Sequence, residues 1–376
     1  MGISFFRTQT GGRNAMNPAI GKRIDYRGIT KAYGKHVALR PTDLTIEAGE
    51  FFAIIGPSGS GKTTLLGLTA GFVAPSGGDI LIDGRSIGGV PPFKRNIGMV
   101  FQNYSLFLHK TVAENIAFPL KMRGVAAREI EARVADALAQ VRLADYAGRL
   151  PTALSGGQQQ RVAFARAAVY NPSLLVMDEP LSALDKNLRE GLQFEIKQLH
   201  AKFGSTVLYV THDQGEAAAM ANRIAIMSAG EIVQIGSAKE LYSRPRNRFV
   251  ASFLGSANIF PVETLERRGS TAIAHCEGGL TLNGVLSGDV QRKACVCVRP
   301  EAIVVTPVRI DRDNALEGEV IDTTFSNGIQ RHWVRLSTGA VVEQQQHINR
   351  DRYAAGVGEQ VFVEWSAGDS LVINME

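Results

Sequence analysis

The clearest chemistry in the sequence lies in one glycine-rich segment, residues 56–63, with the sequence GPSGSGKT. Two of its glycines, separated by four residues, precede a lysine and a hydroxyl. A turn of this composition leaves backbone N–H groups unshielded and aimed at one point, which is what phosphate oxygens require. The segment predicts a site for a nucleoside triphosphate, with a plain glycine turn as the alternative.

The flanking residues favour the phosphate site over a plain turn. The apolar run 51–55 before the segment predicts a strand, and residues 64–68 after it continue a helix. The positive end of that helix would face the anion. Lys62 is then placed to reach the β- and γ-phosphates, and Thr63 offers a hydroxyl to Mg²⁺.

Two adjacent carboxylates, Asp178 and Glu179, follow a second apolar run at residues 173–177. Open α/β sheets position their ligands at the carboxyl ends of strands. Asp178 is a candidate to hold Mg²⁺ through its water shell, and Glu179 to polarise the water that attacks the γ-phosphorus. A solvated acidic strand end is the alternative for both residues.

A third apolar run, residues 206–210, leads to His212. Its imidazole can hydrogen-bond the γ-phosphate or orient the attacking water, and an ordinary surface histidine is the alternative.

A second anion-binding helix start is predicted at residues 154–161, LSGGQQQR. Ser155 can cap this helix, whose first N–H groups lie behind Gly156 and Gly157. Two such sites in one chain require an explanation.

Six motifs in this order resemble those of the nucleotide-binding subunit of an ATP-binding cassette (ABC) transporter, over residues 24 to about 255. They are Walker A (56–64), the Q-loop glutamine (Gln102), the signature (154–158), Walker B (174–179), the D-loop (182–185) and the switch histidine (His212). Tyr33 matches the aromatic residue that stacks on adenine in this family, although a lone tyrosine more often packs against its own chain.

The resemblance implies a head-to-tail homodimer in which each ATP lies between Walker A of one subunit and the signature of the other. Two helix N-termini and Lys62 would converge on the negative charge, so ATP would hold the dimer closed until hydrolysis loosened it. Glu179 and His212 would be catalytic, and Asp185 would act in the D-loop. The remaining implied residues are those that bind ATP (Tyr33, Ser58, Gly59, Ser60, Gly61, Lys62, Thr63, Thr64, Gln102, Asp178), those that act on the ATP of the partner subunit (Ser155, Gly156, Gly157, Gln158) and those that hold Mg²⁺ (Thr63, Gln102, Asp178).

The elements that must position these residues form an α/β pattern. Between residues 22 and 237, short apolar runs alternate with helical stretches, which predicts a domain around a largely parallel sheet. The expected strands are 51–56, 173–179, 206–212 and a hairpin of 223–228 with 231–235.

Two helical regions are expected within this domain. Ile130, Val134, Leu138 and Val141 recur on one apolar stripe, so we expect an inserted helical subdomain at about 103–170. Residues 185–203 form a second amphipathic pattern that ends at a glycine.

The C-terminal third has a different character. Beyond residue 258, short alternating runs predict a small all-β barrel or a pair of barrels. The predicted fold is thus an α/β P-loop ATPase followed by a barrel. Its parts would be a flexible segment at 1–22, an ABC nucleotide-binding domain at 23–255 and a regulatory β-barrel domain at 256–376.

Composition supports a multidomain chain that contains no predicted membrane span. At 376 residues and 45% hydrophobic content, two or three domains are expected. No stretch approaches the roughly 20 apolar residues of a spanning helix, and the first residues lack the layout of a secretion signal. Cys295 and Cys297 are expected to be small buried hydrophobes rather than metal ligands, and the His275–Cys276 pair lacks the spacing of a zinc site. Three cysteines in all fit a reducing cytosol.

The C-terminal sequence also resembles that of importer ATPases. Residues 297–303, CVRPEAI, resemble the barrel domain appended to ATPases that serve polyamines, iron, sugars, phosphonates or opines, and residues 182–190 and 247–255 look closest to the spermidine/putrescine branch. The implied partners are two integral-membrane permease subunits and, indirectly, an extracytoplasmic solute-binding protein. The implied location is the cytoplasmic face of the inner membrane, with residues 103–118 receiving a permease helix. Leu108 stands where relatives usually carry proline.

The sequence is also compared with two other classes of ATP-binding protein. A soluble ABC ATPase that acts on nucleic acid would suit the pI near 9.1. Such relatives usually carry a long coiled coil or two cassettes in tandem, and this chain has neither, so no nucleic acid partner is expected. A module that binds ATP without turnover is disfavoured by Glu179 and His212.

Overall fold

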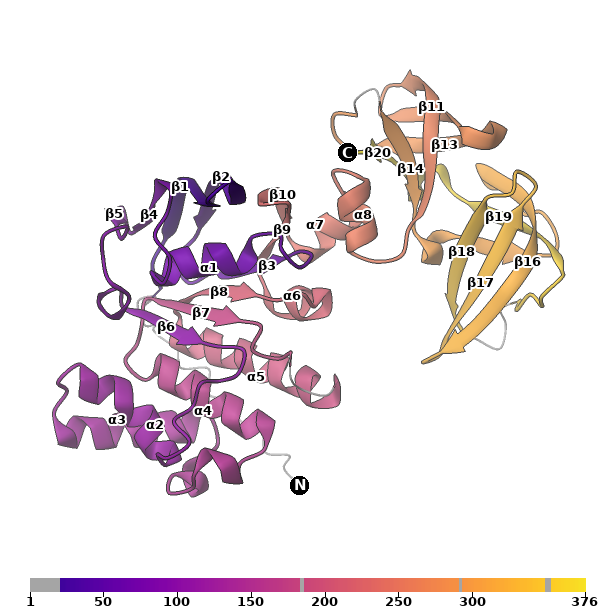
Figure 1. The fold of residues 1–376 in the computed structure, drawn as a ribbon. Coiled ribbons are helices and arrows are strands. Elements are labelled where there is room, and N and C mark those ends of the chain that lie inside the picture. Colours follow the sequence, from indigo (N-terminus) through magenta and orange to yellow (C-terminus); the bar gives the residue numbers. More distant parts are fainter. Residues whose placement is uncertain (1–20, 183–185, 291–292, 349–352) are drawn as a thin grey trace, which may run out of the picture. The chain divides into compact units, whose positions relative to one another are not determined.

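The computed structural model describes residues 21–376 except 183–185, 291–292 and 349–352 (Figure 1). The predicted N-terminal segment, as far as residue 20, and the D-loop residue Asp185 therefore lie outside the described residues. Contacts divide the chain into two compact units: a first unit within residues 1–54, 61–212 and 229–231, and a second unit of residues 55–60, 213–228 and 232–376. The domain boundary at residue 255 remains a prediction.

A buried parallel sheet lies at the centre of the first unit. Its strands β3 (Phe51–Ile55), β8 (Thr206–Val210), β7 (Leu174–Asp178) and β6 (Ile97–Val100) lie side by side in that order. All pairs are parallel, with Phe51 opposite Val207 and Leu174 opposite Thr206. The strands are almost continuously apolar because both faces of the sheet are covered. Their carboxyl ends consequently meet at one edge.

Helix α1 (Lys62–Ala70) packs between this sheet and a second, antiparallel one (Figure 1). The second sheet has the order β2 (His36–Ile46), β1 (Ile24–Tyr33), β4 (Gly77–Ile82), β5 (Arg85–Ser86). The hydroxyls of Tyr26 and Thr69 share a buried hydrogen bond of 2.8 Å that ties β1 to α1. Nη1 of Arg95 donates to the carbonyls of Leu68 and Thr69, so the C-terminus of α1 is satisfied.

The predicted helical region is present. It contains α2 (Val112–Met122), α3 (Ala127–Gln140) and α4 (Gly156–Ala168), with short 3₁₀ turns at Pro92–Lys94, Ala144–Tyr146 and Pro151–Ala153, and α5 (Lys186–Phe203) follows β7. The predicted stripe Ile130, Val134, Leu138 and Val141 is buried. Gly98 in β6 allows α4 to approach closely, since a Cβ there would lie 2.4 Å from the carbonyl oxygen of Ala167. Among the described helices, none combines the length and apolar character that a membrane span needs.

The second unit begins with short elements and continues into β-structure. The short elements are α6 (Gln214–Met220), β9 (Arg223–Ser228), β10 (Glu231–Gly236), α7 (Ala238–Ser243) and α8 (Arg248–Phe253). A closed barrel follows, in the order β11 (Asn258–Arg268), β12 (Thr271–Cys276), β13 (Leu280–Leu286), β20 (Ser370–Asn374), β14 (Ala294–Val298).

A five-stranded sheet, not a second barrel, completes the C-terminal part. Its order is β15 (Val304–Thr306), β19 (Gln360–Trp365), β16 (Asn314–Ser326), β17 (Ile329–Leu336), β18 (Val341–His347), with 3₁₀ turns at Glu277–Gly279, Pro300–Ala302 and Ala367–Asp369. The barrel and the sheet share one apolar core in which the rings of Phe260 and Trp365 stack at 6.3 Å.

The three cysteines are buried in this unit as free thiols, as predicted for Cys295 and Cys297. Burial raises the pKa of Cys276 to about 11 and that of Cys295 to about 12, which keeps both as neutral, unreactive side chains.

Arg299 fastens the barrel to the short helices before it. Its guanidinium donates to the carbonyls of Ala251, Gly255, Ser256 and Tyr242 at 2.8–3.4 Å. It also lies 4.0 Å from the centre of the Tyr242 ring. One cation therefore satisfies carbonyls at the end of α8, where the helix itself offers no donor.

We expect Arg299→Ala to destabilise the second unit by about 2–4 kcal/mol, because charge-assisted hydrogen bonds contribute roughly 1.5–3 kcal/mol each and do not add fully. Both tryptophans of the chain, Trp333 and Trp365, lie in β17 and β19 of this unit. Urea unfolding followed by tryptophan fluorescence therefore reports on it directly. Arg335→Ala, at an exposed position of β17, is the matched control. Equal midpoints for the two variants would contradict the role given to Arg299.

Candidate ATP site

The glycine-rich loop connects the end of β3 to the start of α1, as its sequence predicts. Gly59 and Gly61 have φ of 77° and 101°, a region that favours glycine. Gly56 is required for a different reason, since a Cβ there would lie 2.2 Å from the carbonyl oxygen of Met227. The N-cap of α1 is Gly61, so no side chain covers the helix start. The loop has the features of a phosphate cradle.

Lys62 and the two carboxylates lie close enough to interact within the first unit. The Lys62 side chain is buried, and this burial lowers its pKa, while Glu179 and Asp178 act in the opposite direction. Burial also raises the pKa of Asp178, a shift that Glu179 increases and Lys62 opposes. The site therefore concentrates negative charge around one buried cation, which is an environment that a bound cation would stabilise.

Glu179 has a strained backbone with φ of 43°. A non-glycine residue in this region costs about 1–3 kcal/mol, and such strain persists only where the surroundings impose it. Here the Glu179 N–H donates to the Val210 carbonyl at 2.8 Å, and the Glu179 carbonyl accepts from the Ser182 hydroxyl at 2.9 Å. These bonds fix the carboxylate at the carboxyl edge of the sheet, beside the end of β8.

His212 and Gln102 both lie close to Glu179, His212 by direct contact and Gln102 through Ser182. Nδ1 of His212 is 3.1 Å from Oε2 of Glu179, and its ring is largely exposed. Nε2 of Gln102, just beyond β6, donates to the hydroxyl of Ser182 at 3.2 Å. The structure thus brings Lys62, Asp178, Glu179 and His212 together and links Gln102 to them through Ser182, a contact that the sequence did not reveal.

Ser155 caps α4, as predicted. Its hydroxyl accepts from the Gln158 N–H at 3.4 Å, and Oε1 of Gln158 accepts from the Ser155 N–H at 3.0 Å. This reciprocal capping box gives Gln158 a structural role and presents Gly156 and Gly157 at an ordered helix start.

Tyr33 lies at the end of β1 and is half exposed. Nζ of Lys31 is 4.8 Å from the centre of its ring. The stacking of Tyr33 on adenine, which the family resemblance implies, remains a prediction.

Two residues that the sequence did not single out organise the segment after Gln102. They are Asn115, which is fully buried in α2, and Arg166, in the last turn of α4. The available signal was a polar or charged side chain within an apolar helix stripe, such as the arginine of FARAA at 164–168.

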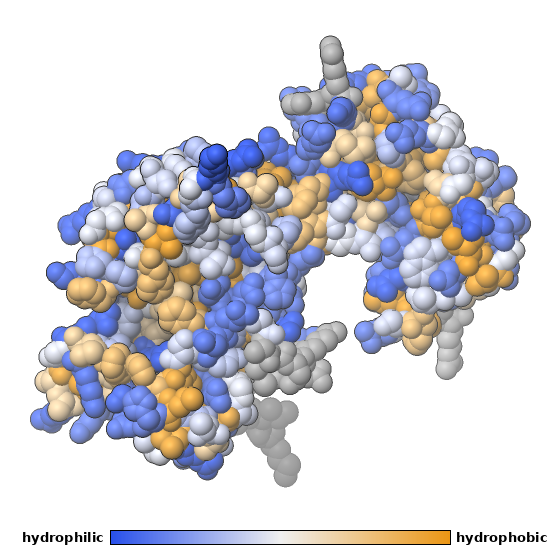
Figure 2. All heavy atoms as spheres, viewed as in Figure 1, coloured by the Kyte–Doolittle hydropathy of each residue, from blue (hydrophilic) through white to orange (hydrophobic). Residues whose placement is uncertain are grey.

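Two cavities are not lined by Lys62, Asp178, Glu179 or His212, but the first of them includes residues of the segment 103–118 that is predicted to receive a permease helix. One of about 380 Å³ in the first unit is lined mainly by Met99, Phe101, Phe107, Phe118 and Tyr170. Apolar residues are also exposed on the surface around α2 and α3 (Figure 2).

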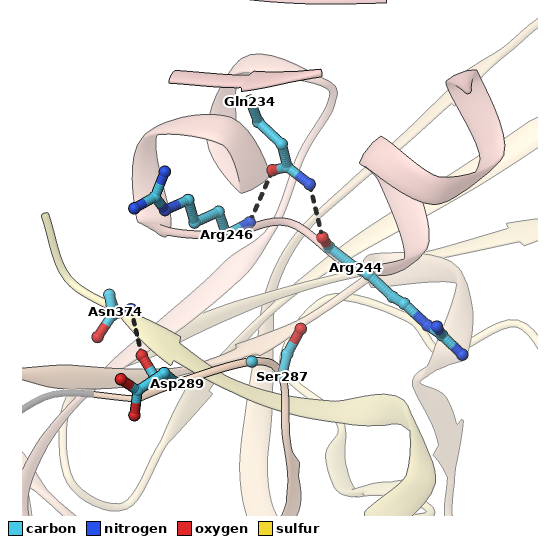
Figure 3. A pocket seen from close by; sticks show the side chains of 7 residues that line it. Gln234, Arg244, Arg246, Ser287, Asp289 and Asn374 are labelled. Atoms are coloured by element: carbon cyan, nitrogen blue, oxygen red, sulfur yellow. Dashed lines mark hydrogen bonds between the residues drawn. The ribbon is translucent and has the colours of Figure 1, made fainter. Parts of the chain in front are cut away.

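Another cavity, of about 520 Å³, lies in the second unit and is lined mainly by residues with polar or charged side chains (Figure 3). Its lining includes Arg244, Arg246 and Asp289. The side-chain amide of Gln234 bridges the first two residues, donating to the Arg244 carbonyl and accepting from the Arg246 N–H.

Comparisons with known proteins agree with this architecture. Residues 39–182 match the family model described as ABC transporter, and residues 296–373 match the TOBE domain. The spermidine/putrescine import ATP-binding protein PotA 2 of Pseudomonas aeruginosa is 46% identical over 324 residues, covering 85% of this chain and 89% of the relative. PotA of Roseobacter denitrificans is 40% identical and PotA of Thermotoga maritima 38% identical, each match covering 95% of this chain and 99% of the relative.

The chain belongs to the import ATP-binding subunits of the ABC transporter family. It is an ATPase whose cassette binds ATP, and the predicted fold class is confirmed. The ATP-binding cassette MJ0796, solved as a dimer bound to ADP and Pi, is 34% identical with a TM-score of 0.52, and the match covers 57% of this chain and 98% of MJ0796. A second dimeric structure of that cassette gives the same values.

The shifted pKa of Asp178 predicts a pH-dependent stability. Because its folded pKa is raised above the unfolded value, ionised Asp178 destabilises the nucleotide-free fold, and the loss develops as pH rises from the unfolded to the folded pKa. Asp178→Asn should therefore melt at a higher temperature than wild type at pH 7.5, with a difference that disappears at acidic pH.

Asp25→Asn is the control of opposite sign. A hydrogen bond from Arg23 is the main cause that lowers the pKa of Asp25, so its stabilisation is present above the unfolded pKa and lost as pH falls. Thermal melting of both variants without nucleotide, across a pH series, checks the prediction. A lower melting temperature for Asp178→Asn at pH 7.5 would contradict it.

Proposed function

We propose that two copies of this chain close around two molecules of Mg-ATP and that this cycle powers the import of spermidine, putrescine or a related polyamine. The observation that carries the proposal is the gathering of Lys62, Asp178, Glu179 and His212 at the carboxyl edge of one sheet. The names of the PotA relatives support the solute class, and the dimeric cassette structures support the pair of subunits.

In the proposed reaction, Glu179 polarises the water that attacks the γ-phosphorus. Its contact with His212 orients the carboxylate, and the imidazole can reach the γ-phosphate or the water through Nε2. Lys62 neutralises charge on the β- and γ-phosphates. A buried lysine has lost hydration, so its interaction with the phosphates is stronger than in water.

The residues proposed for Mg²⁺ fit this ion. A threonine hydroxyl, an amide oxygen and a carboxylate are the hard oxygen donors that Mg²⁺ prefers. Gln102 donates through Nε2 to Ser182, which leaves Oε1 for a cation. Thr63, Gln102 and Asp178, the last through water, would hold the ion, which when bound neutralises the charge that develops on the phosphates.

The signature supplies the second half of each site. Ser155, Gly156 and Gly157 present an ordered helix start, and a helix start attracts anions. A dimer in which this turn meets the triphosphate held by the other copy explains why one chain carries two phosphate-binding helix starts.

The membrane partner is proposed to dock on the apolar cavity of the first unit. Phe107 and Phe118 form its centre, with ring centroids 4.6 Å apart, and Leu108 beside them is 58% exposed. A short helix from each of two permease subunits would insert there, which would hold the chain at the cytoplasmic face of the membrane. A solute-binding protein would act through the permease.

Glu179→Gln should retain ATP binding and lose at least about 100-fold in turnover, a loss of the size typical when a general base is removed. The substitution keeps the size of the side chain but removes its capacity to accept a proton. Steady-state phosphate release and equilibrium binding of ATP measure the two effects, and size-exclusion chromatography with ATP should show a stable dimer. Wild-type turnover by this variant would exclude Glu179 as the catalytic base.

Lys62→Ala serves as the contrasting variant. It removes the cation that contacts the phosphates, so ATP affinity itself should fall at least tenfold. Unchanged affinity would show that Lys62 does not bind the nucleotide.

The solute class is tested in proteoliposomes that contain this chain, its permease and its binding protein. Spermidine or putrescine should accumulate with ATP and should stimulate hydrolysis, while iron, sugars and phosphonates should not. Stimulation by one of these other solutes alone would replace the polyamine assignment but keep the import function.

A further inference from the structure

The segment that follows Gln102 is held by an arginine of α4. Arg166 donates through Nη2 to the Tyr104 carbonyl and through Nη1 to the Ser105 carbonyl, both at 2.8 Å. Tyr104 and Ser105 have φ of 61° and 45°, so both have unfavourable left-handed backbone. A planar guanidinium presents two parallel donors, which matches two successive carbonyls that this unusual backbone turns to the same side.

Asn115 of α2 holds the same segment from its other end. Its side-chain amide accepts from the Phe107 N–H at 2.9 Å and donates to the carbonyls of Phe107, Lys110 and Thr111 at 3.0–3.1 Å. Asn115 is completely buried. Residues 104–111 are therefore fixed between α2 and α4.

Helix α4 connects residues 104–111 to the signature. It starts at the Ser155 cap and carries Arg166 in its last turn. An intact α-helix moves as a rigid body, so a displacement of residues 104–105 that pulls on Arg166 also displaces Ser155. Burial lowers the pKa of Arg166, in agreement with a guanidinium that is enclosed by its partners.

We propose that Arg166 is a positioning residue that couples the segment at 104–111 to the signature helix, so that movement of the membrane partner sets the position of Ser155 against ATP. The inference deepens the proposed import function and rests on it. Asn115 shapes the segment, whereas Arg166 joins it to the signature helix. A structural role alone would make Arg166 necessary for folding but not for coupling.

The first test uses the isolated chain and requires no permease. In hydrogen exchange monitored by mass spectrometry, Arg166→Gln should increase exchange at least tenfold at 104–106 and also at 156–158, although the two segments lie at opposite ends of α4. Arg166→Lys, which keeps a cationic donor, should restore much of the protection.

Arg123→Gln is the matched control, because Arg123 donates to the Pro119 carbonyl and stacks on Tyr170 at 3.6 Å without bonding residues 104–105. It should leave both segments unchanged. Increased exchange at 104–106 alone, with 156–158 as in wild type, would overturn the coupling. If Arg166→Gln unfolds globally, the same two segments are compared in Arg166→Lys. Full protection at one segment together with loss of protection at the other would then overturn the coupling.

The second test uses the assembled transporter in proteoliposomes. Arg166→Gln should lose at least tenfold of the solute-stimulated ATPase rate, whereas the unstimulated rate of the isolated chain should fall by a smaller factor. Wild-type stimulation in this variant would refute the proposal. If the wild-type assembly itself shows no stimulation, the proposed import function fails, and the exchange experiment still decides whether Arg166 joins the two segments.

Discussion

Negative charge at the carboxyl edge of one parallel sheet is the constraint on which the site depends. Asp178 and Glu179 are adjacent, and burial makes ionised Asp178 unfavourable without a cation nearby. Lys62 supplies one buried positive charge. A triphosphate would add further negative charge, and in the proposed site Mg²⁺, the glycine loop and a second helix start would offset it. The need to hold anions beside carboxylates thus explains why the site takes groups from several elements.

The strained backbone connects this electrostatic centre with its surroundings. Glu179, Tyr104 and Ser105 all have positive φ, and each is hydrogen-bonded to a neighbouring element: Glu179 donates to β8, and Tyr104 and Ser105 accept from α4. Elements that are held in this way have few alternative positions. This suits a site whose geometry must change between a few defined states and not over a continuous range. Within the second unit, Arg299 joins the barrel to α8 and the residues after it through the carbonyls of Ala251 and Ser256.

The sequence alone was sufficient to predict the local structure of the candidate site. The glycine loop, the paired carboxylates and the Ser155 cap are short-range patterns whose spacing carries their meaning, and the buried Ile130 stripe followed from helix periodicity. Arg166, Asn115 and the Gln102–Ser182 contact could not be predicted, since each depends on residues brought together only by tertiary packing. The sequence also could not predict that the five-stranded sheet stays open, because the spacing of strands along the chain does not show whether a sheet closes.

The two helix starts at Lys62 and Gly156, both predicted to bind phosphate, are the feature that most strongly favours a shared site between copies. The most direct measurement is a structure of the Glu179→Gln chain determined with Mg-ATP. The γ-phosphate should contact Lys62 of one copy and the Ser155 hydroxyl and Gly157 N–H of the other. A nucleotide that is enclosed by a single copy, with the signature of every neighbour facing away from it, would contradict the proposed motor.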